Sequence, residues 1–195
     1  MSDKQLWLLV GGNGAGKTSF YELFLKLKGL SFINADSIAQ TLSPEAHKDV
    51  SYEAAVLAER MRQDMVDQGL SFCFETVYSH PSKIDFTAQA KALGYQVILV
   101  FIHLDDPELN LARISQRVSE GGHDVPEQKV RSRLPRTFNN VVQAIAIADE
   151  AHILDNSSWD EPFRRVAFIR DGEIQVLCDP APIWVRELLG SEPTD

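Results

Sequence analysis

Short apolar runs alternate with amphipathic stretches along most of the chain. Continuous apolar runs of this length are typical of buried strands, and we expect strands at residues 6–10, 30–35, 70–75, 95–104 and 151–157. Apolar residues recur at helical spacing between these runs, and we expect helices at residues 20–27, 51–69, 80–94 and 105–122. Such an alternation predicts an α/β fold, with a parallel sheet and helices on both of its faces.

Two of these helices carry apolar stripes that we expect to face the core. The first stripe consists of Phe20, Leu23, Phe24 and Leu27, and the second of Ala54, Leu57, Met61 and Met65. Gly29 and Gly69 follow the two helices, at positions where glycine commonly ends a helix.

The C-terminal part follows a different pattern. Asp124 and Glu127 stand at capping-box spacing, which predicts a short helix there, and Pro135 separates it from a second amphipathic helix. Two strand-like runs in residues 164–179 flank Asp171 and Gly172, a sequence typical of a hairpin turn. A last helix is expected at 182–189. Because no internal repeat or low-complexity linker is present, we expect one domain over residues 1–195, with the hairpin and helix at about 163–190.

A glycine cluster separates the first expected strand from the first expected helix. Gly11, Gly16, Lys17 and Thr18 match the pattern G-x-x-x-x-G-K-[ST], in which loop amides at a helix N-terminus hold phosphate groups. Lys17 would neutralise phosphate charge and assist catalysis, and the Thr18 hydroxyl would be a ligand of Mg²⁺. The predicted nucleotide-binding residues are Gly11, Gly12, Asn13, Gly14, Ala15, Gly16, Lys17, Thr18 and Ser19.

The composition and charge of the chain argue against some classes of binding partner. The net charge of −9 argues against a nucleic-acid-binding surface, and no apolar run is long enough to span a membrane. The first strand starts close to Met1 and the two cysteines form no metal-binding spacing. We therefore expect a cytoplasmic protein with no nucleic-acid or membrane partner.

Polar residues stand where the expected parallel strands end. Asp36 follows the second strand, Glu75 and Thr76 end the third, and Asn156 lies at the end of the fifth. Ligands bind at this edge of open α/β sheets. One carboxylate would accept a proton from an attacking hydroxyl, and the other would hold the substrate or a metal-bound water. The alternative for Asp36 is a helix cap before Ser37.

An arginine-rich segment at about residues 113–136 surrounds the glycine-containing stretch SEGGHDVPEQ. Its arginines are Arg113, Arg117, Arg131, Arg133 and Arg136. We interpret the segment as a lid whose guanidinium groups neutralise charge on a transferred phosphoryl group. The alternative is a solvated basic face that pairs with Glu120, Asp124 and Glu127.

The stretches GGNGAGKTSF, FETVYSH and GGHDVPEQKVRSR, in this order, resemble the zeta-toxin-like P-loop kinases over residues 6–158. The resemblance implies a kinase-type sheet, ATP or GTP with Mg²⁺, and transfer to a sugar hydroxyl of UDP-N-acetylglucosamine. It implies that Asp36 is catalytic and substrate-binding, and that Glu75 and Thr76 bind the substrate. Typical members are longer, and their sugar contacts match this chain only at Asp36, Glu75 and Thr76.

By the same resemblance, Arg117 and one of Arg131 or Arg133 contact the phosphates. Arg117 and Arg133 are the predicted catalytic arginines, and Arg117, Arg131 and Asn156 are predicted nucleotide-binding residues. Three functions stay open at this point. They are a kinase for a small hydroxyl-bearing metabolite, a nucleotide-binding ATPase module or nucleotide kinase, and a toxin controlled by a small antitoxin protein.

Overall fold

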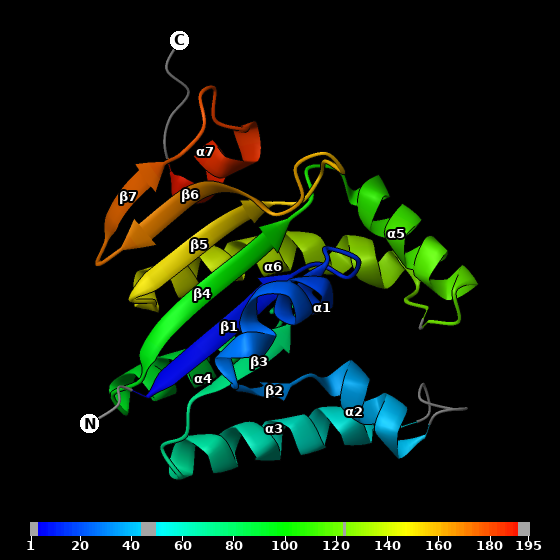
Figure 1. Cartoon of the computed structure of the whole chain (residues 1–195), viewed down its shortest axis with the longest axis vertical. Helices are drawn as coiled ribbons and strands as arrows, with labels where there is room; N and C mark the ends of the chain where they lie inside the picture. The colour runs from blue at the N-terminus through cyan, green and yellow to red at the C-terminus, as the bar shows by residue number, and fades with distance from the viewer. Residues whose placement is uncertain (1–3, 44–49, 123, 191–195) are drawn as a thin grey trace.

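The computed structural model describes residues 4–43, 50–122 and 124–190. A seven-stranded sheet lies at its centre, in the order β2-β3-β1-β4-β5-β6-β7 (Figure 1). The strands are β1 (Gln5–Gly11), β2 (Ser31–Ile33), β3 (Phe72–Thr76), β4 (Gln96–His103), β5 (Glu150–Asp155), β6 (Arg164–Arg170) and β7 (Glu173–Val176). The first five are parallel, and β6 and β7 join antiparallel as a hairpin. The predicted parallel sheet with a C-terminal hairpin is confirmed.

Helices cover both faces of this sheet, as predicted. They are α1 (Lys17–Phe20), which continues as a π-helical turn η1 (Tyr21–Leu25) and a 3₁₀ turn η2 (Lys26–Lys28), α2 (Ala35–Leu42), α3 (Ser51–Asp67), α4 (Ser82–Ala92), α5 (Pro107–Ser119), α6 (Glu127–Ile147) and α7 (Ile183–Leu189). Apolar residues of α3, α4, α6 and α7 pack on one face, and α1 with η1 packs on the other. α5 lies beyond the carboxyl ends of the strands (Figure 1).

The register of β1 places the glycine loop beside two other strand ends. Leu9 pairs with Glu75 of β3, and Gly11 pairs with Ile102 of β4. Successive residues of a strand point to opposite faces, so Leu8 and Leu9 enter different apolar clusters. The loop that follows Gly11 therefore emerges next to the carboxyl end of β3, where Glu75 lies.

The region after residue 124 differs from the prediction, because α6 is one helix over Glu127–Ile147 and not two. Pro135 lies inside it and is exposed. An interior proline removes a backbone hydrogen bond and disfavours a helix by about 3 kcal/mol. Val130 and Val141, on the two sides of Pro135, are both buried, and this packing keeps the helix continuous.

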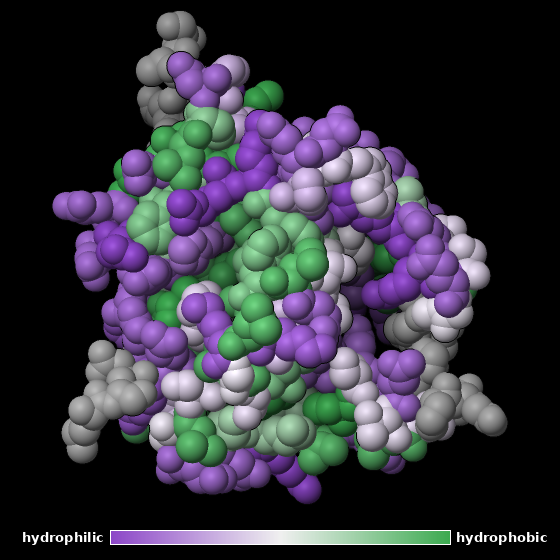
Figure 2. Space-filling model, viewed as in Figure 1, coloured by the Kyte–Doolittle hydropathy of each residue, from purple (hydrophilic) through white to green (hydrophobic). Residues whose placement is uncertain are grey.

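The apolar stripe expected on the first helix does not face the core. Leu23, Phe24 and Leu27 are 63%, 52% and 95% exposed, whereas Tyr21 and Leu25 are buried. The π-helical turn over Tyr21–Leu25 changes the directions in which the side chains of this helix point. The side chains of Tyr21 and Leu25, which are four residues apart, therefore face the sheet. Figure 2 shows an apolar patch over this helix, in the middle of the view.

The stripe expected on α3 is also shifted. Ala54, Ala58, Arg62 and Val66 are the buried residues of this helix, and Leu57 and Met61 are more than a third exposed. The guanidinium of Arg62 lies 4.1 Å from the centre of the Phe74 ring. The face of an aromatic ring attracts a cation. This contact explains how an arginine occupies a buried position on α3 that the apolar pattern did not predict.

Candidate active site

The glycine loop adopts the backbone that its sequence predicts. Gly14 and Gly16 have φ angles of 79° and 98°, a region that residues with a Cβ rarely occupy. A Cβ at Gly16 would lie 2.6 Å from the side-chain amide nitrogen of Asn156. Both positions therefore need glycine, for the backbone angle and for the close approach of a neighbour.

Three side chains, one of them from the loop motif itself, hold the carbonyl groups of this loop. Lys17 donates to the Gly12 carbonyl at 3.0 Å, Asn110 of α5 donates to the Asn13 carbonyl at 2.7 Å, and Asn156 donates to the Ala15 carbonyl at 2.9 Å. Asn110 and Asn156 are 1% and 5% exposed. The bonded carbonyls leave the loop amides as groups that can bind an anion at the start of α1.

The ammonium of Lys17 is buried between charges of both signs. Burial lowers its pKa, Glu75 and Asp36 raise it, and Arg117 and Arg133 lower it. Glu75 Oε1 is 3.8 Å from Lys17 Nζ. The charges of Asp36, Arg117 and Arg133 therefore lie close enough to Lys17 to act on it.

Glu75 also contacts Thr18. The Thr18 hydroxyl donates to Glu75 Oε2 at 2.9 Å, and the side chain of Glu75 is 9% exposed. A carboxylate beside a threonine hydroxyl at the end of a glycine loop is an oxygen-rich donor set that suits Mg²⁺. Among the residues that the structure describes, no three His, Cys, Asp or Glu side chains come together as a preformed metal site, here or at another place.

Asp36 is not the helix cap that the sequence left as an alternative. Asn34 caps α2, since its side-chain oxygen accepts hydrogen bonds from the amides of Asp36 and Ser37 at 2.7 and 3.2 Å. Asp36 lies in the first turn, is exposed and lines the cavity next to the glycine loop. Because Asn34 supplies the cap, the Asp36 carboxylate is not used to cap α2.

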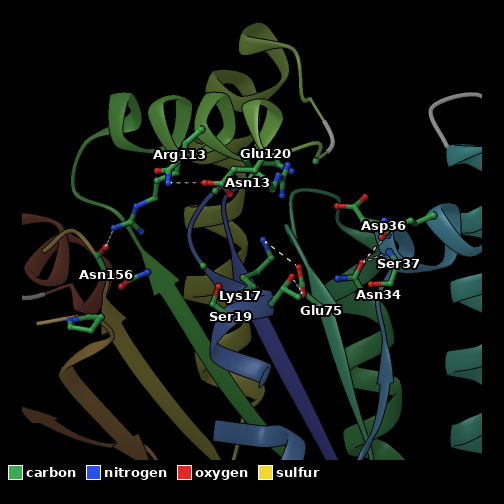
Figure 3. Close-up of a pocket in the computed structure, with 18 of the residues that line it drawn as sticks. Asn13, Lys17, Ser19, Asn34, Asp36, Ser37, Glu75, Arg113, Glu120 and Asn156 are labelled. Carbon is green, nitrogen blue, oxygen red and sulfur yellow. Dashed lines mark hydrogen bonds and ion pairs between the residues drawn. The ribbon is translucent and has the colours of Figure 1, made fainter. Parts of the chain in front are cut away.

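The cavity has a volume of about 620 Å³, and Lys17 lies between two different ends (Figure 3). One end, here the aromatic end, is lined by Arg113, Asn156, Trp159, Pro162 and Phe163. Arg113 lies 5.0 Å from the Trp159 ring and donates to the Asn156 carbonyl at 2.8 Å. The other end, here the polar end, is formed by Asp36, Ser37 and Gln40 of α2. Ser51, Gln116 and Glu120 also line the cavity.

The arginine-rich segment forms the end of α5, the following turn and the first half of α6, so most of it is helical. Arg117 lines the cavity, and Arg133 approaches it through a 3.4 Å hydrogen bond to the Asn13 side chain.

Arg131, a predicted nucleotide-binding residue, does not line the cavity beside the glycine loop. It is ion-paired with Glu108 at 2.5 Å and Glu127 at 2.7 Å, on a separate surface hollow. Two residues along a helix differ by about 200° in direction, so Arg131 and Arg133 face different ways.

Thr76 is a second predicted site residue that lies apart from the cavity lining. Its hydroxyl accepts a hydrogen bond from the Tyr78 amide at 3.0 Å. Thr137 and Asn140 of α6 donate to the carbonyls of Val77 and Tyr78, each at 2.8 Å. Thr76 therefore belongs to a loop that α6 holds in place, and its hydroxyl is used within that loop.

Ten predicted residues do line the cavity, namely Asn13, Gly14, Gly16, Lys17, Thr18, Ser19, Asp36, Glu75, Arg117 and Asn156. Gly11, Gly12 and Ala15 form the inner side of the loop. Sequence reasoning missed Asn110, which bonds the loop, and several lining residues, among them Asn34, Ser37, Gln40, Ser51, Gln116, Glu120, Trp159, Pro162 and Phe163. None of these residues is part of a sequence motif that would identify it as a site residue.

The family model that describes zeta toxins matches residues 2–158. The chain belongs to the zeta toxin family. This confirms the resemblance carried by the glycine loop, FETVYSH and GGHDVPEQKVRSR. Membership of this family, together with the kinase-like sheet, supports nucleotide-dependent phosphoryl transfer in general.

Relatives of this zeta toxin family member include a protein of Haemophilus influenzae described only as uncharacterized. It is 31% identical over 143 residues, which are 68% of this chain and 99% of the relative. A chain in the crystal structure of AvrRxo1-ORF1:-ORF2 with ATP has a TM-score of 0.76 and 21% identity, and the match covers 98% of this chain and 65% of that one. This chain thus spans slightly less than two thirds of the length of that chain.

The PezAT chromosomal toxin-antitoxin system of Streptococcus pneumoniae contains a further similar chain. It has a TM-score of 0.58 and 19% identity, with 80% of this chain and 68% of that chain covered. At such identities, the two structural matches show a shared fold.

Proposed function

We propose that this protein is a kinase that transfers the γ-phosphoryl group of ATP or GTP to a hydroxyl of a small metabolite. The observation that carries the proposal is the convergence of Lys17, Glu75, Asp36 and two arginines beside the glycine loop. A phosphate loop alone would serve many nucleotide-binding proteins. The carboxylate of Asp36, exposed in the cavity and free of a capping role, is the feature that a transfer to a hydroxyl requires.

The loop residues fit a nucleotide and its metal ion. Amides of residues 13–19 and the Lys17 ammonium would hold the β- and γ-phosphates. The Thr18 hydroxyl would be a ligand of Mg²⁺, and Glu75 would hold water bound to that ion, given its 2.9 Å contact with Thr18. When bound, the ion neutralises charge on the phosphate oxygens.

The aromatic end suits the base of the nucleotide. Trp159 is 75% exposed, and its ring faces the Arg113 guanidinium at 5.0 Å. Flat aromatic and guanidinium surfaces stack on bases. The polar end is then left for the acceptor, close to Asp36.

Each charged side chain has a role in the proposed transfer. Asp36 orients the acceptor hydroxyl and takes its proton as the new phosphorus–oxygen bond forms. Lys17 and Arg117 neutralise the charge that develops on the moving phosphoryl oxygens. Arg133 supports them from α6 through its hydrogen bond to Asn13.

The acceptor that the family resemblance implies is a UDP-sugar such as UDP-N-acetylglucosamine. The alternatives are a nucleotide kinase and an ATPase module that transfers the phosphoryl group only to water. The position of Asp36 favours a hydroxyl acceptor over the ATPase module.

An enzyme that consumes a nucleoside triphosphate in this way would work in the cytoplasm. The described ranges contain no helix with the length and apolar character needed to cross a bilayer.

The proposed function is tested by mixing the purified protein with ATP or GTP, Mg²⁺ and a panel of hydroxyl compounds, and by measuring nucleoside diphosphate and phosphorylated product. We expect product with the wild-type protein and none with Lys17→Ala, because the backbone loop alone cannot neutralise the β- and γ-phosphates. Equal nucleotide affinity and equal turnover in Lys17→Ala would contradict the proposal. Nucleotide turnover that no acceptor stimulates would favour the ATPase module.

We also propose a small antitoxin protein as a partner. The support is the PezAT relative, which is described as a toxin-antitoxin system. Induction of the wild-type protein and of Lys17→Ala in growing bacteria tests this proposal. Growth arrest only with the wild-type protein, relieved by the product of an adjacent small gene, would support it.

A further inference from the structure

We infer that Asn156 is a positioning residue that couples the base of a bound nucleotide to the glycine loop. The segment that would receive the base, here the base segment, is residues 157–163, and its residues Trp159 and Phe163 line the aromatic end. Contact of a base with this segment then helps to hold the glycine loop in the conformation needed for phosphoryl transfer. The inference rests on the proposed function, in which the aromatic end binds the base.

The side-chain amide of Asn156 joins the glycine loop to the end of the base segment. Its Nδ2 donates to the Ala15 carbonyl at 2.9 Å, and its Oδ1 accepts a hydrogen bond from the Phe163 amide at 3.1 Å. Asn156 is 5% exposed, and the bond to Ala15 is buried. One amide group therefore holds a carbonyl of the glycine loop and the main chain of the base segment together.

The main chain of Asn156 is fixed as well. Its amide donates to the His103 carbonyl at the end of β4 at 2.9 Å, and its carbonyl accepts a hydrogen bond from Arg113 Nη2 at 2.8 Å (Figure 3). Because these groups of Asn156 are bonded within the protein, a positioning role suits the residue better than direct recognition of the nucleotide. A hydrogen-bonded side chain that is held on all sides can transmit a restriction from one partner to another.

Phe163 gives the base segment a second contact with the glycine loop. A Cβ at Gly16 would lie 3.2 Å from Phe163 Cε1, and the Phe163 ring packs edge-on against Phe20 of α1 at 5.4 Å between ring centres. Phe163 has a φ angle of 57°, which residues with a Cβ rarely adopt and which persists only where the surroundings hold it. The bond to Asn156 is one of the contacts that hold it. The conformation at the end of the base segment therefore depends on Asn156.

Trp159 is the residue at which a base would act on this connection. Its side chain is 75% exposed and lies 5.0 Å from the Arg113 guanidinium. A base that stacks on Trp159 restricts the base segment, and through Asn156 it also restricts the Ala15 carbonyl. In the proposed function, the loop amides next to this carbonyl hold phosphate groups. Contact with the base should therefore raise kcat as well as nucleotide affinity.

A double-mutant cycle of Trp159→Ala and Asn156→Ala tests this coupling, with kcat and KM for ATP measured in the presence of Mg²⁺ and an acceptor. We expect Trp159→Ala alone to raise KM and to lower kcat by about three- to tenfold, the size of one net hydrogen bond. In the Asn156→Ala background, Trp159→Ala should raise only KM, because the connection to the glycine loop is already lost. Trp159→Phe, which keeps a flat ring, should restore kcat.

A purely structural role of Asn156 predicts a different result, in which Trp159→Ala changes kcat by the same factor in both backgrounds. The melting temperature of each variant is measured, and Asn156→Ser takes the place of Asn156→Ala in the cycle if Asn156→Ala does not fold. Leu27→Ala is the control for the loss of an exposed apolar side chain. Leu27 is 95% exposed and is not among the residues that line the cavity, so this change should leave kcat and KM as they are.

The outcomes separate this inference from the proposed function. A kcat of Trp159→Ala equal to or above the wild-type value overturns the inference, and so does an equal decrease of kcat in both backgrounds. Either result, obtained with a phosphorylated product, leaves the kinase upheld. If no acceptor is phosphorylated, the same cycle is measured on nucleotide hydrolysis. A decrease of kcat that disappears in the Asn156→Ala background then upholds the coupling, although the proposed transfer to a hydroxyl has failed.

Discussion

The side-chain amide of Asn110 donates a hydrogen bond to the main-chain carbonyl of Asn13 at 2.7 Å. Asn110 belongs to α5 and is 1% exposed, and Asn13 belongs to the glycine loop. The bond therefore connects the helix that covers the cavity to the loop that would hold phosphate. It gives the partly buried Asn13 carbonyl a partner within the protein.

Asn110→Ala should weaken nucleotide binding, although Asn110 itself is not among the residues that line the cavity. The Asn13 carbonyl loses its partner, and leaving such a group unsatisfied costs about 1–3 kcal/mol, which is about tenfold in affinity if the loop must rearrange to bind. Calorimetry with a nonhydrolysable ATP analogue and Mg²⁺ measures the effect. Asn139→Ala, an exposed change on α6, is the control. An affinity equal to that of the control would show that the loop keeps its shape without Asn110.

Asp36→Asn should reduce phosphoryl transfer by about 10²–10⁴-fold, because an amide cannot take the proton of the acceptor hydroxyl. Since Asn34 already caps α2, melting temperature and nucleotide affinity should stay close to wild type. All three are measured on one preparation. Glu75→Gln is the comparison, because a change beside Thr18 should weaken the dependence of nucleotide affinity on Mg²⁺. Transfer at the wild-type rate in Asp36→Asn would remove its catalytic role.

Arg117→Ala and Arg133→Ala should each lower kcat more than they lower nucleotide affinity. Charge on the moving phosphoryl group grows in the transition state, and losses of about 10³-fold are expected for a guanidinium that acts on it directly. Arg131→Ala is a matched control from the same helix, because Arg131 pairs with Glu108 and Glu127. Steady-state kinetics and nucleotide titration give both values. A loss in Arg131→Ala as large as in Arg133→Ala would contradict the assignment of faces.

His103 should make stability depend on pH in the acidic range. Burial against Phe138 and Trp184 lowers its pKa from 6.5 to about 4, with Asp155 opposing the shift. Because the folded pKa lies below the unfolded one, the stabilisation is complete above about pH 6.5 and is lost as pH falls toward 4. The loss approaches about 3 kcal/mol. Urea unfolding at pH 7 and pH 5 measures the part of this loss that has occurred by pH 5, about 2 kcal/mol.

His103→Gln should remove that part of the pH dependence, and His80→Gln, a change at an exposed histidine, should leave it. The same difference between pH 7 and pH 5 in wild type and His103→Gln would show that other groups cause it.

The sequence predicted those parts of the site that depend on chain order along the sheet. Neighbouring parallel strands end at the same edge of the sheet, whichever way the helices pack. A glycine loop after one strand and acids directly after the next strands therefore come together. Glu75 and Asp36 were found for this reason. Asn110 was not, because a buried amide that bonds a carbonyl 97 residues away leaves no periodic pattern.

Helix faces were harder to predict than strand ends. Arg131 and Arg133 are both arginines in one expected segment, and only the direction of α6 decides which one approaches Asn13. Pro135 misled the prediction of α6, because local preference favoured two helices and the buried residues on both sides favoured one. The π-helical turn after α1 likewise depends on packing that the spacing of apolar residues does not contain.

Side chains of α6 donate two hydrogen bonds to the carbonyls of Val77 and Tyr78. These bonds also limit the fraction of molecules in which α6 is displaced from its packed position. An outward swing of α6 would strip both carbonyls of their partners, at about 1–3 kcal/mol each, so the swung-out form amounts to at most a few per cent of the molecules. Arg133, on the same helix, is therefore held beside Asn13 before a nucleotide binds.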